Sequence, residues 1–270
     1  MTCDATNLHR LIPEHARVAL FVAHPDDEAV SAGALLCLLR HPEIVCITDG
    51  APRNLHDALA AGFANLEDYA EGRRNECSIA LSGIGIPRER VHWLGFADQQ
   101  SSFAMANLAR SVLKAIETIA PAIVLTHPYE GGHPDHDSTA FSVHAATACL
   151  RAKGKESPGV LEFTSYHIRA GNLVTFEFLT YANEQVTLRL SPEEQQRKRD
   201  MLACYRTQRA VLSQFPIDVE RVRPAPKYRF TQPPHPGRLH YEHYDWGITG
   251  ARWRALANQA LLELGIAEPL

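Results

Sequence analysis

Short apolar runs alternate with longer stretches of helical periodicity over the first 150 residues of the chain. We predict strands at 17–22, 43–48, 90–94 and 123–126, and helices at 28–40, 66–82, 103–120 and 135–152. The strand segments are apolar throughout, which is typical of a parallel sheet covered by helices on both faces. Because right-handed crossovers place the helices there, the alternation predicts an α/β fold, a Rossmann-like and mostly parallel sheet.

The sequence changes character beyond about residue 153. We find two strand-like segments at 160–168 and 173–181, a charged helix from Pro192 to about Val211, and a proline-rich stretch from Pro216 to Pro236. This pattern favours an extension of the same sheet over a second domain. We therefore predict one domain over 1–270, with a core at about 15–190. An irregular C-terminal extension, a helix and then a proline- and aromatic-rich wrap, is expected at about 191–270.

Composition limits the partners of the chain. Its 270 residues are 45% hydrophobic and carry a formal net charge of -4, so it can bury a core but lacks the basic surplus that attracts nucleic acids or anionic membranes. The six cysteines form no CxxC pair and indicate buried thiols in a reducing compartment. No cationic leader or membrane-length apolar run is visible. We therefore expect a cytoplasmic protein with a small-molecule substrate, no nucleic-acid partner and no membrane span.

Two loops rich in histidine and carboxylate follow predicted strands. "AHPDDE" (23–28) leaves the strand at 17–22, and "THPYEGGHPDH" (126–136) leaves the strand at 123–126. Loops at the carboxyl ends of parallel strands line the ligand crevice, so both should lie at the functional edge of the sheet. Imidazole nitrogen with carboxylate oxygen is a zinc-type donor set, and a catalytic zinc takes three protein ligands and one water.

Other interpretations account for part of this pattern. Asp26 and Asp27 suit the start of a helix, where carboxylates stabilise exposed N–H groups. That role does not require the paired histidines or a second charged loop on the same edge. A metal-free carboxylate glycosidase leaves the histidines unexplained, and a non-catalytic sugar-binding protein has no need of the intact histidine and aspartate set.

The sequence resembles the PIG-L or LmbE-like zinc-dependent N-deacetylases. The resemblance rests on four segments within roughly the first 150 residues: "AHPDDE" (23–28), "RRNECSIA" (73–80), "VHWLGFAD" (91–98) and "HPDH" (133–136). It implies a hydrolase that removes an N-acetyl or similar N-acyl group from an amino sugar conjugate. It also implies one Zn²⁺ per chain, or another divalent metal, held by His24, Asp27 and His136. Closed symmetric assemblies are common among such enzymes, so a homo-oligomer is among the expected forms.

The resemblance also implies roles for Asp26 and His133, and each role has a physical reason. Asp26, next to the ligand Asp27, would take the proton of an attacking water and later deliver it to the departing amine. A protonated His133 would stabilise the oxyanion that forms on the amide carbonyl. We expect Asp135, in the same "HPDH" turn, to pair with that imidazole and raise its pKa.

Three further residues are predicted to contact the substrate. Arg73 stands three residues before a glutamate, where the family pattern uses an arginine on sugar hydroxyls; an exposed helix charge is the alternative. Asp98 follows the strand at 90–94, a position equally typical of a turn. Tyr129 lies four residues before His133, an offset that differs from the mobile tyrosine of some family members. His127 is read as either a loop-packing residue or a substrate contact.

Overall fold

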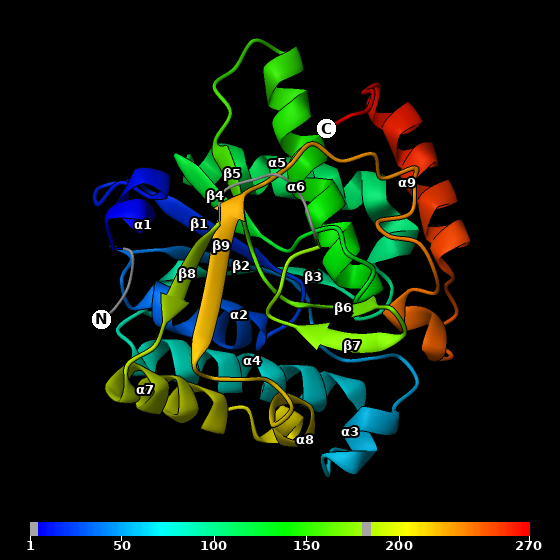
Figure 1. The fold of residues 1–270 in the computed structure, drawn as a ribbon. Coiled ribbons are helices and arrows are strands. Elements are labelled where there is room, and N and C mark those ends of the chain that lie inside the picture. Colours follow the sequence, from blue (N-terminus) through cyan, green and yellow to red (C-terminus); the bar gives the residue numbers. More distant parts are fainter. Residues whose placement is uncertain (1–4, 180–184) are drawn as a thin grey trace.

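A seven-stranded sheet organises the part of the chain that the computed structural model describes, residues 5–179 and 185–270 (Figure 1). Its strand order is β3-β2-β1-β4-β5-β9-β8. The parallel strands are β1 (Val18–Val22), β2 (Glu43–Thr48), β3 (Val91–Phe96), β4 (Ile123–Thr126) and β5 (Gly159–Phe163). Two antiparallel strands, β9 (Val219–Pro224) and β8 (Val186–Arg189), extend one edge. The predicted α/β class with a mostly parallel sheet is therefore confirmed.

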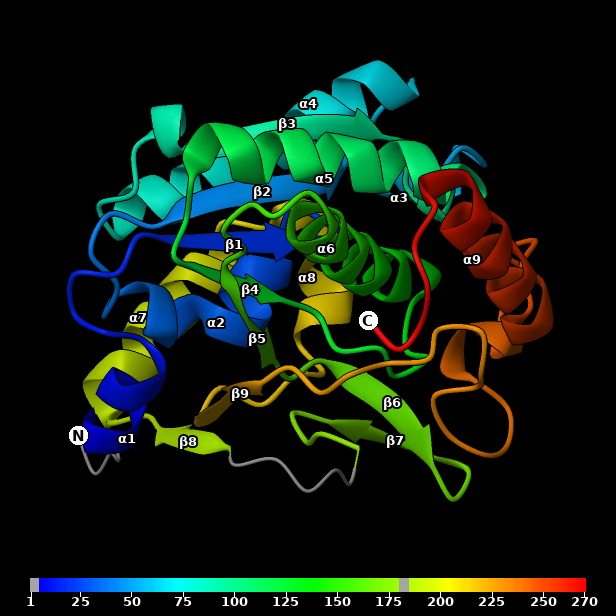
Figure 2. The ribbon, with the colours of Figure 1, turned by 90° about the horizontal axis from the view of Figure 1, so that it is seen from above.

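Helices cover both faces of this sheet (Figure 2). On one face lie α1 (Ala5–Leu11), α2 (Asp27–Leu36), α4 (Leu66–Gly83) and α7 (Pro192–Ala203). On the other face lie α5 (Met105–Ile119) and α6 (Pro134–Ala152), and α9 (Gly250–Leu264) packs against α5. The alternating side chains of β1 divide between the two layers, since Leu20 belongs to the first core and Phe21 to the second. This burial on both faces explains why the strand segments are apolar throughout.

A kink in α2, the helix that follows the first histidine-rich loop, allows this helix to bind strand β9. The backbone of Ala32 leaves helical geometry at φ -143°, which frees N–H groups of the following turn. Glu220 of β9 accepts hydrogen bonds from the N–H groups of Ala34 and Leu35, both at 2.9 Å. Lys198 of α7 donates to the same carboxylate at 2.8 Å, and both charged side chains are buried. The second half of α2 is thus held by strand β9.

The eight elements predicted within residues 17–152 are present with bounds shifted by a few residues. The structure adds α3 (His56–Ala60) and short 3₁₀ turns at Arg88–Arg90, Ser101–Ala104, Arg206–Gln208 and His240–His243. No helix of the described residues has both the length and the apolar content that a membrane span requires.

The C-terminal expectation needs correction. The proline-rich stretch is not irregular throughout, because it supplies β9, in which Glu220 and Arg223 are buried in ion pairs. The predicted long helix ends at Ala203 and is followed by a 3₁₀ turn and α8 (Arg209–Leu212). A separate hairpin forms from β6 (Tyr166–Arg169) and β7 (Asn172–Thr175), and the strand-like segment at 173–181 ends outside the described residues. The division into one domain stays a prediction.

Candidate active site

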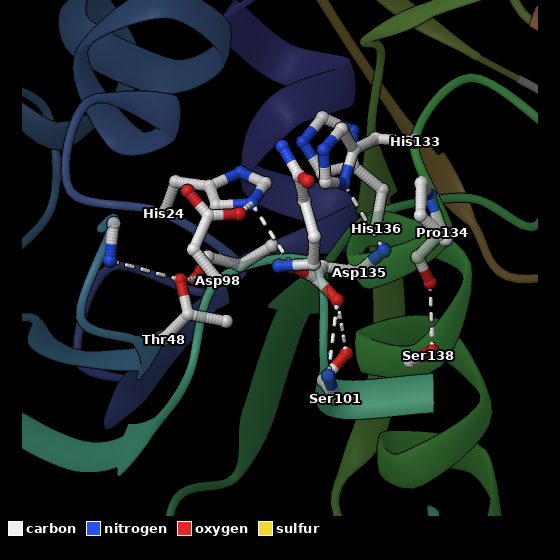
Figure 3. Close-up of polar contacts among 12 residues, drawn as sticks. His24, Thr48, Asp98, Ser101, His133, Pro134, Asp135, His136 and Ser138 are labelled. Atoms are coloured by element: carbon white, nitrogen blue, oxygen red, sulfur yellow. Dashed lines mark hydrogen bonds and ion pairs between the residues drawn. The ribbon is translucent and has the colours of Figure 1, made fainter. Parts of the chain in front are cut away.

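A cavity of about 310 Å³ opens at the carboxyl ends of the parallel strands. The loops after β1, β3 and β4 bring their polar side chains to it, as the topology of a parallel sheet requires. Figure 3 shows side chains from these three loops pointing toward one another. Seven of the nine residues predicted for the site line the cavity: His24, Asp26, Asp27, Arg73, Asp98, His133 and His136. Asp135 lies directly behind them, and Tyr129 does not belong to the cavity.

Two of the three predicted metal ligands, His24 and His136, contact the carboxylate of the third, Asp27. Its Oδ2 lies 3.3 Å from His24 Nδ1, and its Oδ1 lies 3.2 Å from His136 Nε2. Burial alone would raise the pKa of Asp27, but the nearby imidazoles of His136 and His127 outweigh burial and hold this pKa well below its usual range. Ligand atoms at the corners of a zinc tetrahedron lie about 3.3 Å apart. Both distances are close to this value, one from each carboxylate oxygen of Asp27.

Further donor atoms surround these three ligands. Three overlapping groups of the described residues could hold a metal ion, each with all donor atoms within 4.8 Å of one another. They are His24, His133 and His136; Asp27, His127 and His136; and His24, Asp98, His133 and Asp135. His127 is a packing residue here, because its ring stacks on His136 at 4.0 Å and its Nε2 accepts from the Ala23 N–H. A histidine and aspartate cluster that could hold a metal is thus present, and it is richer than the predicted trio.

Asp135 contacts His24 rather than the His133 imidazole, which corrects the predicted pairing. Its Oδ2 lies 3.3 Å from His24 Nε2 and accepts the Gln99 N–H at 2.6 Å, while its Oδ1 accepts from Ser101 Oγ at 2.5 Å (Figure 3). A carboxylate on the far nitrogen of a ligating histidine fixes the tautomer and orientation of the ring. Asp135 therefore orients His24 toward the cavity.

The same contacts change the expected protonation of His133. Its Nδ1 accepts a hydrogen bond from the Asp135 N–H at 3.1 Å, so a neutral ring carries its proton on Nε2. Burial, reinforced by His24 and His136, holds the pKa of His133 well below its usual range. The expected rise in this pKa is therefore wrong, because the carboxylate of Asp135 is directed elsewhere. His133 is a neutral N–H donor.

Asp26 is held in an unusual backbone conformation beside the ligands. Its φ is 151°, in the region that favours glycine, and Arg73 donates to its Oδ2 at 3.0 Å. Burial raises the pKa of Asp26 to about 8 even though the Arg73 guanidinium opposes this shift. A carboxyl group with a pKa near neutrality can both accept and return a proton at neutral pH.

Arg73 is buried and its guanidinium is occupied by the protein itself. It donates to the carbonyl oxygens of Gly50 at 2.5 Å and Pro25 at 3.0 Å, in addition to Asp26. It therefore positions the loop that carries Asp26, and the alternative of an exposed helix charge is wrong. Its predicted contact with sugar hydroxyls stays a prediction.

The two other predicted substrate contacts differ in their placement. Asp98 lines the cavity, with its Oδ1 3.2 Å from His24 Nε2. Tyr129 lies instead in an aromatic cluster, where its ring stacks on Trp253 at 5.1 Å and its hydroxyl donates to the Gln232 carbonyl at 2.8 Å. Tyr129 therefore supports the C-terminal segment instead of facing substrate, as its altered offset from "HPDH" signalled.

Sequence reasoning missed several residues that complete the site. Ser101 and the Gln99 N–H bind Asp135, and nothing in the local sequence marks a serine as a carboxylate partner. Glu28, in the "AHPDDE" segment, accepts from the Tyr205 hydroxyl and from the Asp26 N–H. The cavity-lining rings of Tyr166, Tyr244 and Trp246 come from segments after residue 160.

This fold and this histidine and aspartate cluster define an α/β protein with a candidate metal centre at the carboxyl edge of its sheet. Residues 19–147 match the PIG-L family, GlcNAc-PI de-N-acetylase. Over this segment, which is a little under half of the chain, the sequence is similar to the PIG-L/LmbE-like family.

Two curated relatives illustrate the match. A probable N-acetyl-alpha-D-glucosaminyl L-malate deacetylase 2 of Bacillus cereus is 32% identical over 148 residues, which cover 52% of this chain and 64% of that protein. A 1D-myo-inositol 2-acetamido-2-deoxy-alpha-D-glucopyranoside deacetylase 2 of Saccharopolyspora erythraea is 27% identical over 228 residues, 71% of this chain and 82% of that protein. The chain thus covers less than two thirds of the first of these relatives.

A solved structure supports the fold. The deacetylase of the teicoplanin biosynthesis pathway superposes with a TM-score of 0.60 and 17% identity, over 77% of this chain and 97% of that one. This share of the chain is larger than residues 1–147, so the structural likeness extends into the C-terminal region.

Proposed function

We propose that this protein is a zinc-dependent hydrolase that removes an N-acetyl or similar N-acyl group from an amino sugar conjugate. The observation that carries the proposal is the convergence of His24, Asp27 and His136 beside Asp26, at donor spacings that suit zinc. The names of the relatives support the substrate class, since both are deacetylases of N-acetylglucosaminyl conjugates. The cytoplasmic location and a homo-oligomeric form belong to the same proposal and rest on the sequence alone.

His24, Asp27 and His136 would hold the metal, with Asp135 fixing the His24 ring from behind. When bound, a divalent metal polarises the amide carbonyl and lowers the pKa of water. The side chains supply the rest of the reaction. Asp26 accepts the proton of the attacking water and returns it to the amine as the C–N bond breaks. His133 donates its Nε2–H to the oxyanion, so that acetate and a free amine are the products.

The supporting contacts explain why Asp26 is suited to this role. Arg73, which also donates to the Pro25 carbonyl, holds the Asp26 carboxylate in place, and burial keeps the pKa of Asp26 near neutrality. A general base that is fixed in this way loses little orientational freedom when the substrate binds.

The proposal is tested by comparing Asp26→Asn with Asp27→Ala. Zinc content is measured by mass spectrometry, and acetate release is measured over a panel of N-acetylated sugars. Asp26→Asn should retain zinc and lose turnover, because it removes the base and keeps the ligands. Asp27→Ala should lose zinc as well. Asp218→Asn, an exposed aspartate far from the site, is the matched control and should change neither readout.

Two outcomes would contradict this division of roles. Equal loss of zinc in both variants would mean that Asp26 is a ligand instead of a base. Sugar release that persists after complete removal of the metal would support a metal-free glycosidase and end the proposal.

A further inference from the structure

The cavity has a polar side and an apolar side. The polar side carries the histidines and carboxylates described above, with Arg73 beneath them. The apolar side is formed by Val30, Leu173, Val211, Leu212 and Phe215 together with three aromatic side chains. Except for Val30, these apolar residues lie outside the segment that matches the family, residues 19–147. The two sides therefore come from different parts of the chain.

An aromatic wall joins the apolar side directly to the two histidines of the "HPDH" turn. It consists of six cavity-lining rings, His133, His136, Tyr166, His240, Tyr244 and Trp246. Successive ring centroids lie between 4.6 and 5.4 Å apart, and the circuit closes from His136 back to His133. Contacts at this spacing hold aromatic side chains in fixed positions. The amide that reacts at His133 would thus have a fixed aromatic surface next to it.

Apolar surface remains exposed at the mouth of this cavity. Eight large apolar side chains of the described residues are exposed, and Leu173, Val211 and Tyr244, at 46%, 50% and 48% exposure, all line this one cavity. Scattered apolar residues on a surface need no explanation, but apolar side chains gathered at a pocket mark a binding surface.

The charges of the lining disfavour an anionic ligand. Among the described residues that line the cavity, Arg73 is the single lysine or arginine, and it is committed to Asp26 and two backbone carbonyls. Four aspartates line the same cavity, Asp26, Asp27, Asp57 and Asp98. A phosphate or carboxylate on the substrate would find no free cationic side chain there.

From this lining we infer that the cavity selects uncharged N-acyl amines that carry an apolar alkyl or aryl group beside the scissile amide. This apolar group lies against Leu173, Val211, Phe215 and Tyr244. The inference rests on the proposed function, because it names the substrate class of the same site. The apolar group is on either the sugar aglycone or the acyl chain, and the arms of the experiment separate the two.

Binding to the metal-free protein tests the inference without turnover. Calorimetry compares octyl with methyl N-acetyl-β-glucosaminide for the aglycone, and methyl N-octanoyl- with methyl N-acetyl-β-glucosaminide for the acyl chain. At least one octyl-bearing ligand should bind about tenfold or more tightly than its short partner, since several CH₂ groups leave water. N-acetylglucosamine 6-phosphate should bind more weakly than N-acetylglucosamine. Equal affinity within both pairs, or tighter binding of the phosphate, would overturn the inference.

Variants locate the apolar group. Val211→Ser and Tyr244→Ala should each reduce, several-fold, the ratio of the affinity for the octyl ligand to the affinity for its short partner. Leu262→Ser is the matched control, because Leu262 is 75% exposed on α9 and lies outside the cavity lining. A preference that survives both cavity variants, or that falls equally in the control, would mean non-specific adsorption and would also overturn the inference.

Turnover separates this inference from the proposed function. With the zinc-loaded protein, kcat/KM for acetate or octanoate release should follow the binding preference. A binding preference without release from any ligand would contradict the proposed hydrolase and leave the apolar selection standing. Release that is equally fast from the short ligands, with no binding preference, would support the proposed hydrolase and overturn the apolar selection.

Discussion

The N-terminal region, residues 19–147, and the C-terminal region, residues 148–270, contribute different things to one cavity. The N-terminal region supplies the candidate ligands, the proposed base and every lining carboxylate, and it alone matches the family. The C-terminal region supplies Leu173, Phe215, Tyr244 and most of the remaining apolar lining. If the proposed function holds, the reacting groups and the apolar surface for the substrate come from separate stretches of chain.

The two regions also handle buried charge differently. In the N-terminal region, buried charges gather at one point, where Asp27 faces His24 and His136, and Asp135 faces the other nitrogen of His24. In the C-terminal region, the ion pairs Lys198–Glu220 and Arg223–Glu162 serve the added strand β9. The buried charges of the N-terminal region form the candidate ligand site, and the buried ion pairs of the C-terminal region attach the apolar side to the sheet.

The largest effect is expected from Glu220→Ala. It leaves Lys198 buried without its partner and removes the acceptor of the Ala34 and Leu35 N–H groups. Breaking a buried ion pair on one side costs about 3–5 kcal/mol of unfolding free energy, measured by urea denaturation. The double variant Lys198→Met with Glu220→Leu should recover part of this loss. A cost below about 1 kcal/mol would mean that β9 does not hold α2.

Asp135→Asn tests the buried charge of the N-terminal region. Loss of the carboxylate behind His24 should weaken zinc binding about 10- to 100-fold, measured by competition with a chelator. Asp137→Asn is the matched control, because that buried carboxylate accepts from the Gly131 N–H and not from a ligand. Equal zinc affinity in the wild type and Asp135→Asn would refute the orienting role.

The contact between the two regions should depend on pH through His144. This residue of α6 is buried against Tyr228 and Phe230, and burial lowers its pKa to about 4. A histidine in the unfolded chain takes up a proton near pH 6.5, so the unfolded state binds the extra proton and stability falls as the pH drops from 6.5 towards 4. Between pH 7 and pH 5, the wild type should lose about 2 kcal/mol more than His144→Phe. If the unfolding free energies of the wild type and His144→Phe change equally between pH 7 and pH 5, this effect is excluded.

The smallest effects are expected at the helix caps, one in each region. Asn65 accepts from the Asp68 N–H at the start of α4, and Ser191 forms a capping box with Glu194 at the start of α7. Replacing either residue by alanine should cost about 1 kcal/mol of unfolding free energy. Zinc affinity should not change in either variant. A changed zinc affinity in Ser191→Ala would show that the C-terminal region influences the candidate metal site of the N-terminal region.

The sequence predicted most of the N-terminal region because local patterns decide its structure. Buried parallel strands are apolar throughout, so their sequences are easily recognised. Loops at the carboxyl ends of such strands share one edge of the sheet, and this rule alone places residues 24–28 next to residues 133–136. Asp135 was assigned to the wrong histidine, because three histidines lie near it and only the folded backbone shows which one its carboxylate reaches.

The C-terminal region was less predictable for a physical reason. Strand β9 carries charge at Glu220, Arg221 and Arg223, a composition that usually marks a solvated segment. Glu220 and Arg223 are buried instead, because Lys198 and Glu162 arrive from distant parts of the chain. Pairings of this kind leave no local signal, and the same is true of the aromatic wall.

The backbone of Asp26 has an evolutionary consequence. Asp26 has a φ of 151°, a backbone conformation that glycine adopts readily and other residues rarely do. This strain costs of the order of 1–3 kcal/mol of folding free energy. A descendant of this protein that no longer needed the reaction could gain stability by a single change to glycine at this position. Persistence of the aspartate in a lineage would then be a record of selection for activity, since drift under selection for folding alone would remove it.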